Sequence, residues 1–159
     1  MTTAISSRIW SEEAPPTTFD VPGFWTSTWN GIVRLVKGPI ASSAPNAARD
    51  SLLLDAAVAL RRGRAGEASA LLAPHATALA RDVAYLNLVG AACELRHEWK
   101  LARRFYGVAM SVDPTYPPAQ QNMRRLYELY AFGHTREPVS LGDSDIRRNR
   151  TVCVSHDNQ

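Results

Sequence analysis

The chain lacks the residues and runs that define several large protein classes. It has only two cysteines, Cys93 and Cys153, so a disulfide framework of the secreted kind is excluded, and no CxxC or paired Cys/His pattern suggests zinc. No stretch approaches the roughly 18 continuous apolar residues that cross a bilayer. The N-terminus has no basic region followed by an apolar run, as a signal peptide would. We therefore expect a protein kept in a reducing cytoplasm.

Recognised catalytic motifs are missing too. The sequence contains no G-x-S-x-G, HExxH, P-loop or G-x-G-x-x-G pattern. The histidines stand in unrelated contexts, and none has an acidic or nucleophilic partner at helical spacing: His75, His97, His134 and His156. We expect a protein that is not an enzyme, with no catalytic, cofactor or metal site and no small-molecule substrate. An enzyme whose site is assembled from distant residues is a remote alternative.

Positive charge is in small excess, with a net charge of +3 that falls within residues 49–133. A nucleic-acid-binding protein normally shows a denser basic stripe, a known motif or aromatic residues among the basic ones. We therefore expect no nucleic-acid partner, although a small surplus can steer an acidic partner toward the chain. The preference for Ala and Arg over Lys is typical of a GC-rich bacterial genome.

The chain divides into three zones by composition. Residues 1–48 are rich in Ser, Thr and Pro, residues 49–132 have a helical pattern, and residues 133–159 are polar. The last zone contains residues that discourage a long helix, namely Gly133, Pro138 and Gly142. We expect an N-terminal extension, a helical domain and an extended C-terminal tail.

The helical zone contains a repeat, which is clearest from residue 83 to 116. The chain there reads Leu86-x2-Val89-Gly90-x2-Cys93, then Ala102-x3-Tyr106-x2-Ala109, then Pro114. Each half forms one apolar stripe at helical spacing. The small residues Gly90 and Ala102 allow two antiparallel helices to approach closely, and the buried thiol of Cys93 is expected to be unreactive.

A second, degenerate copy lies 34 residues earlier, from residue 49 to 82. Leu52, Ala56, Ala68 and Leu72 stand at the positions of Leu86, Gly90, Ala102 and Tyr106, and Gly63 and Gly66 mark the predicted turn. Asp55, His75 and Ala80 depart from the pattern. Terminal repeats are often atypical in this way, because one face meets solvent.

A last helix is predicted over residues 117–132. Pro117 and Pro118 suit a first helical turn, and Gly133 suits a C-cap. The domain is therefore expected to be all-α, with two antiparallel helical hairpins (49–82 and 83–116) and a capping helix. An antiparallel bundle with accidental periodicity is the simpler alternative.

The 83–116 copy resembles the tetratricopeptide repeat (TPR) at nearly every signature position, so the fold implied is a short TPR-like α-solenoid. In that family, ligands usually lie along the concave surface formed by the first helix of each hairpin. The resemblance therefore implies a partner-binding groove formed by Arg61, Asn87, Glu94, Gln121, Arg125 and Glu128. The Lys/Asn arrangement that grips a C-terminal carboxylate in some relatives is not reproduced.

An apolar island in the N-terminal zone, residues 24–37, is predicted to be an amphipathic helix. Tryptophans with basic residues suit a membrane interface or a partner surface. The expected anchor residues are Phe24, Trp25, Trp29, Ile32, Val33, Arg34, Val36 and Lys37. Three interpretations stay open: the helix packs on the repeat array, docks into a partner protein, or contacts a membrane surface.

The leading hypothesis is a non-enzymatic accessory or assembly subunit of a bacterial membrane complex, of which respiratory and photosynthetic complexes are examples. We expect it to lie at the cytoplasmic, inner face of the membrane, with the helical array as scaffold and both tails as tethers. In the tail, the segment around Cys153 could add to a partner as a short strand or wedge. The alternative is a soluble regulatory adaptor that captures a peptide in the concave groove.

Overall fold

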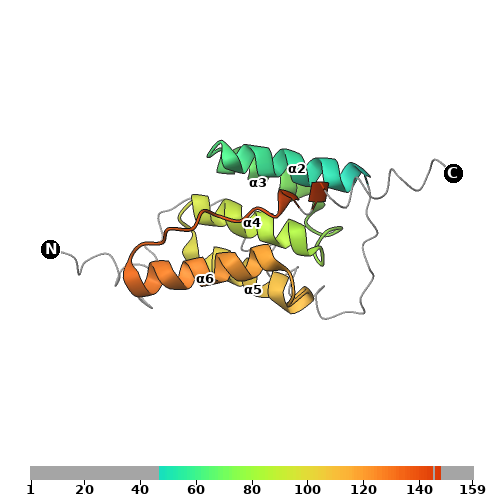
Figure 1. The fold of residues 1–159 in the computed structure, drawn as a ribbon. Coiled ribbons are helices and arrows are strands. Elements are labelled where there is room, and N and C mark those ends of the chain that lie inside the picture. The colour runs from blue at the N-terminus through green and yellow to red at the C-terminus, as the bar shows by residue number, and fades with distance from the viewer. Residues whose placement is uncertain (1–46, 145, 148–159) are drawn as a thin grey trace, which may run out of the picture.

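The structure is a computed structural model that describes residues 47–144, 146 and 147. This part of the chain is all-α and contains no strand. The helices are α2 (Ala47–Arg61), α3 (Ala65–Leu72), the short 3-10 helix η1 (Ala73–His75), α4 (Val83–Leu95), α5 (Trp99–Val112) and α6 (Pro117–Phe132) (Figure 1). None of these helices has the length and apolar character needed to cross a bilayer.

Helix ends follow local chemistry. The Asp82 side chain accepts a hydrogen bond from the Tyr85 N–H and caps the start of α4. Two prolines begin α6, where their missing N–H groups would have no partner in any case. Gly133 ends α6 in the left-handed conformation (φ 72°), and its N–H is bonded to the Leu129 carbonyl.

Three-residue turns join α2 to α3 and α4 to α5, so each pair folds back on itself as a hairpin. The helix α4 lies at the centre and contacts α2, α3 and α5, while α6 packs on α5 (Figure 1). Because α4 is covered on several sides, its residues from Ala84 to Glu94 are all buried. The helix α4 therefore forms the centre of the hydrophobic core.

Helix boundaries recur at intervals of 34 residues. The helices α2 and α4 end at Arg61 and Leu95, and α3 and α5 begin at Ala65 and Trp99. The helices α4 and α6 likewise begin at residues 83 and 117. The boundaries thus have the same spacing as the repeat in the sequence.

The first hairpin differs from its expected form in three details. The helix α2 begins at Ala47, two residues before the predicted boundary. Of the two predicted turn glycines, Gly63 lies in the turn, with φ 72°, whereas Gly66 lies inside α3. The helix α3 ends at Leu72, because Pro74 lacks an N–H and its ring would clash with the preceding turn. The predicted N-terminal helix (24–37) and Cys153 lie outside the described residues.

The two helices of the second hairpin approach closely at Gly90. A Cβ atom added there would lie 2.6 Å from Cε1 of the fully buried Tyr106 ring. Any side chain at this position would therefore have to displace an aromatic ring in a close-packed core. Gly107 is a useful contrast, because a Cβ there would meet only Met123 Cε, at an ordinary 3.8 Å.

These two glycines predict opposite effects of the same substitution. Gly107→Ala should raise the free energy of unfolding by up to about 1 kcal/mol, because alanine favours a helix interior. Gly90→Ala gains the same propensity but overpacks the core, so it should lower the free energy of unfolding by about 1–2 kcal/mol. Urea unfolding followed by circular dichroism measures both. Equal stabilisation by the two changes would contradict the close contact at Gly90.

Candidate functional site

After Gly133 the chain turns back and crosses the helices it has just formed. Residues 134–144, 146 and 147, called the return segment below, run along α6 in the opposite direction and reach α2 (Figure 1). The contacts fix this direction: Thr135 bonds to Glu128, Glu137 to Arg125 and Ser140 to Asn122, and then Asp143 pairs with Arg61 of α2. The return segment therefore covers one surface shared by α2, α4 and α6, called the groove below, which includes Arg61, Asn87, Glu94, Asn122 and Arg125. The segment has no helix from His134 to Gly142 and is helical at residues 143, 144, 146 and 147.

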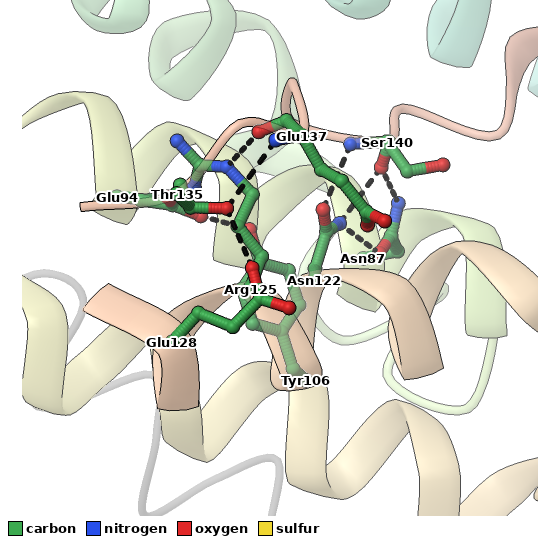
Figure 2. Close-up of polar contacts among 9 residues, drawn as sticks. All are labelled: Asn87, Glu94, Tyr106, Asn122, Arg125, Glu128, Thr135, Glu137 and Ser140. Atoms are coloured by element: carbon green, nitrogen blue, oxygen red, sulfur yellow. Dashed lines mark hydrogen bonds and ion pairs between the residues drawn. The ribbon is translucent and has the colours of Figure 1, made fainter. Parts of the chain in front are cut away.

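The centre of the groove is an asparagine pair that holds the main chain of Ser140 (Figure 2). Asn122 Oδ1 accepts the Ser140 N–H at 2.8 Å, and Asn122 Nδ2 donates to the Ser140 carbonyl at 2.7 Å. Asn87 Nδ2 donates to the same carbonyl at 2.9 Å, and its Oδ1 accepts from Asn122 at 2.9 Å. A side-chain amide carries the same donor and acceptor groups as a peptide bond, so Asn122 pairs with Ser140 much as a neighbouring strand would.

Both asparagines are fully buried (0% exposed), so their hydrogen bonds determine whether burying them costs free energy. A buried amide without hydrogen bonds costs several kcal/mol relative to water, on the order of 2–7 depending on the reference. Here every polar side-chain atom of the pair has a partner, either in the other asparagine or in Ser140. The main chain of Ser140 thus completes the hydrogen bonding of the asparagine pair.

A second main-chain contact lies three residues earlier in the return segment. Arg125 Nε donates to the Glu137 carbonyl at 2.7 Å, while another nitrogen of the same guanidinium pairs with Glu94 (Figure 2). Burial lowers the pKa of Arg125, and the nearby Glu128 carboxylate opposes this shift. The ordinary pKa of a guanidinium lies far above neutral, so Arg125 stays charged at neutral pH and the contact is charge-assisted.

The orientation of Arg125 depends on the core of the second hairpin. Glu94 is buried, and its Oε2 accepts a hydrogen bond from the Tyr106 hydroxyl at 2.9 Å. Burial raises the pKa of Tyr106 well above its ordinary value, so the hydroxyl remains a donor. The chain of contacts from Tyr106 through Glu94 to Arg125 therefore links hairpin packing to the groove.

The far end of the groove binds side chains as well as main chain. Leu141 and Ile146 of the return segment are buried, and Gly142 lies against Tyr116 at the start of α6. Asp143 forms ion pairs with Arg61 and with Arg147 of its own segment. The Arg61 side chain is 48% exposed, so solvent screens this pair and its contribution to stability is small.

Five of the six residues predicted for the groove meet there. Arg61, Asn87, Arg125 and Glu128 each contact the return segment, and Glu94 holds Arg125. The exception is Gln121, whose side chain is exposed. In each case the contact is made to the chain's own residues.

Sequence reasoning missed Asn122, the residue with the most hydrogen bonds to the return segment. A signal was available, because Asn122 falls on the apolar side of α6 with Ala119 and Leu126, at spacings of three and four residues. A polar residue on such a stripe needs a buried partner. Its place, 35 residues after Asn87, also puts it near the equivalent position of the next helix.

Reactive chemistry is sparse in residues 47–144, 146 and 147. No group of three or more His, Cys, Asp or Glu side chains in this range could hold a metal ion. Cys93 is buried, and that burial, with Glu98 nearby, raises the pKa of its thiol, so the nucleophilic thiolate is disfavoured.

A second surface lies on another face of α6, away from the groove. Two aromatic residues are exposed there, Tyr127 (66%) and Tyr130 (44%), and Phe132 (68%) is exposed at the end of the helix. Beside them a hollow of about 410 Å³ is lined by Arg103 of α5 and by Met123, Leu126, Tyr127 and Tyr130 of α6.

Comparisons of the chain with protein-family models, with curated proteins and with solved structures found no match.

The asparagine pair predicts a localised effect of one substitution. Asn122→Ala leaves the Ser140 N–H and Asn87 Oδ1 without partners, so the free energy of unfolding should fall by about 2 kcal/mol. Amide hydrogen exchange at Ser140 should become at least tenfold faster. The matched control is Gln121→Ala, which should change stability by less than about 0.5 kcal/mol. Unchanged exchange at Ser140 in the Asn122→Ala chain would contradict the pairing.

Proposed function

We propose that the chain is a non-catalytic protein–protein interaction module whose groove binds an extended peptide of a partner. The return segment occupies the groove when the partner is absent. The observation that carries this proposal is the pairing of Asn122 with both the N–H and the carbonyl of Ser140. Main-chain pairing of this kind gives affinity for an extended peptide of many sequences, as strand addition to a sheet edge does.

The return segment has the character of a replaceable ligand. In its first half, from His134 to Pro138, every residue except Thr135 is exposed. Among its described residues, Leu141 and Ile146 are buried apolar side chains and Val139 is partly buried against the core, whereas each hairpin helix buries several. Segments with few buried apolar contacts open at low free-energy cost, so a competing peptide can take the same contacts.

The repeat type is part of the same proposal. The 34-residue recurrence of helix boundaries, with short turns within each hairpin, supports a tetratricopeptide-type arrangement. In such an arrangement the first helices line the concave side, where Asn87 of α4 and Asn122 of α6 now meet. The geometry thus favours the peptide-capturing alternative over a purely rigid scaffold.

A proline at position 140 tests whether the groove accepts a peptide from outside. Ser140→Pro removes the N–H that Asn122 accepts but suits an extended backbone, so it should weaken the return segment selectively. A fluorescein-labelled peptide of residues 134–147 should then bind the Ser140→Pro chain at least tenfold more tightly than the unaltered chain. Fluorescence anisotropy with full-length chains measures the two dissociation constants.

Two variants control this experiment. Ser140→Ala keeps both main-chain groups, so the peptide should bind that chain as weakly as it binds the unaltered one. Adding Asn122→Ala to the Ser140→Pro chain should weaken peptide binding by about tenfold, since about 1.4 kcal/mol corresponds to that factor. Binding that is indifferent to Asn122 would overturn the proposed function.

The cellular setting is a separate proposal that draws chiefly on the sequence of segment 24–37. An accessory subunit at the inner face of a bacterial membrane is supported by the tryptophans and basic residues of segment 24–37. The exposed aromatic residues of α6 are a further surface that such a subunit could present to a membrane complex.

Membrane attachment through segment 24–37 predicts a change in fractionation. Replacing Trp25 and Trp29 by alanine should move most of the protein from the membrane pellet to the soluble fraction, because indole rings anchor at the head-group region. Thr26→Ala with Ser27→Ala, on the other face of the predicted helix, should leave the distribution unchanged. An unaltered distribution of the tryptophan variant would refute the tether.

A further inference from the structure

We infer that the groove selects partner segments in which an apolar residue, a glycine and an acidic residue follow one another, with a second apolar residue five positions after the first. This is the pattern of Leu141, Gly142, Asp143 and Ile146 in the return segment. The inference rests on the proposed function and adds the chemical class of the ligand. The asparagine pair holds main chain of any sequence, so selectivity must come from the end of the groove that contacts side chains.

Glycine is the most restricted position of this pattern. Gly142 has φ 72°, a conformation that residues with a Cβ rarely adopt. A Cβ at this position would also lie 2.1 Å from Tyr116 Oη and 3.1 Å from Pro118 Cγ. Both the backbone and the neighbouring start of α6 therefore exclude larger residues.

The two apolar positions supply the buried area. Leu141 is 8% exposed and Ile146 is 3% exposed, and both belong to the same core cluster as Leu53 and Leu60 of α2. A ligand with a polar residue at either position would leave apolar groove surface in water or bury an unpaired polar group. An apolar residue is thus required at both positions.

The acidic position sets the charge of the ligand. Asp143 pairs with Arg61 at the end of α2, close to the helix C-terminus. The exposure of Arg61 makes this contact weaker than the others, so it distinguishes acidic from basic ligands by only a few fold. The groove ligand is therefore an acidic, glycine-containing apolar segment.

The occupant is a segment of a different protein rather than a second copy of this chain. A second copy offers the same contacts as the return segment that is already attached. The attached segment has the advantage of an effective concentration in the millimolar range. Only a ligand of matching pattern with further contacts elsewhere can displace it, and a partner protein can supply these.

The test uses the full-length Ser140→Pro chain and fluorescein-labelled peptides of residues 134–147. Peptides with Leu141→Ala, Gly142→Ala or Ile146→Ala should each bind at least tenfold more weakly than the unaltered peptide. A peptide with Asp143→Lys should bind two- to fivefold more weakly, and should regain that loss on a chain that also carries Arg61→Glu. A peptide with Arg136→Ala is the matched control, because Arg136 is exposed, and its binding should stay within twofold.

The outcomes separate this inference from the proposed function. If all peptides bind equally and Asn122→Ala still weakens binding about tenfold, the groove holds a peptide without selecting it, and the inference is overturned. If no peptide binds, the proposed function fails and the inference fails with it. Size-exclusion chromatography with light scattering should find the Ser140→Pro chain monomeric; a dimer dissociated by the unaltered peptide would assign the groove to a second copy instead.

Discussion

The arrangement depends above all on one interaction, the pairing of the Asn122 side chain with the main chain of Ser140. It joins three parts of the chain, because Asn122 lies on α6, its partner Asn87 lies on α4, and Ser140 belongs to the return segment. Two amides buried at 0% exposure are unfavourable in an apolar core. They become favourable once a peptide main chain supplies the missing donor and acceptor.

This constraint explains why a polar tail folds back although it contains little to bury. Every residue except proline has a main-chain N–H and carbonyl, whatever its side chain. Hydrogen bonds to these groups can therefore order a segment whose sequence has no apolar periodicity. Only Leu141 and Ile146 add appreciable apolar burial at the far end. The resulting segment buries little apolar area, as the proposed exchange with a partner peptide requires.

The sequence predicted the features that local side-chain patterns determine, and it missed those that depend on main-chain contacts. Helix positions such as α4 and α6 were predictable, because apolar spacing, Pro117 and Gly133 are local signals. Asn87, Arg125 and Glu128 were placed in the groove through their repeat positions. The return segment was predicted only as an extended tail, since main-chain contacts to Asn122 leave no pattern in residues 134–147. The early end of α3 was missed because the repeat pattern was extended through Pro74.

The core of the second hairpin and the groove are not independent features. Gly90 is small enough to let the Tyr106 ring lie directly against α4, with Cε1 at 2.6 Å from where a Cβ would stand. That position brings the Tyr106 hydroxyl to Glu94, and Glu94 orients Arg125 toward the Glu137 carbonyl. A larger residue at position 90 would therefore disturb more than the core. Because the ring and the carboxylate are both buried, a shift of Tyr106 would pass to Glu94 and on to the peptide contact of Arg125.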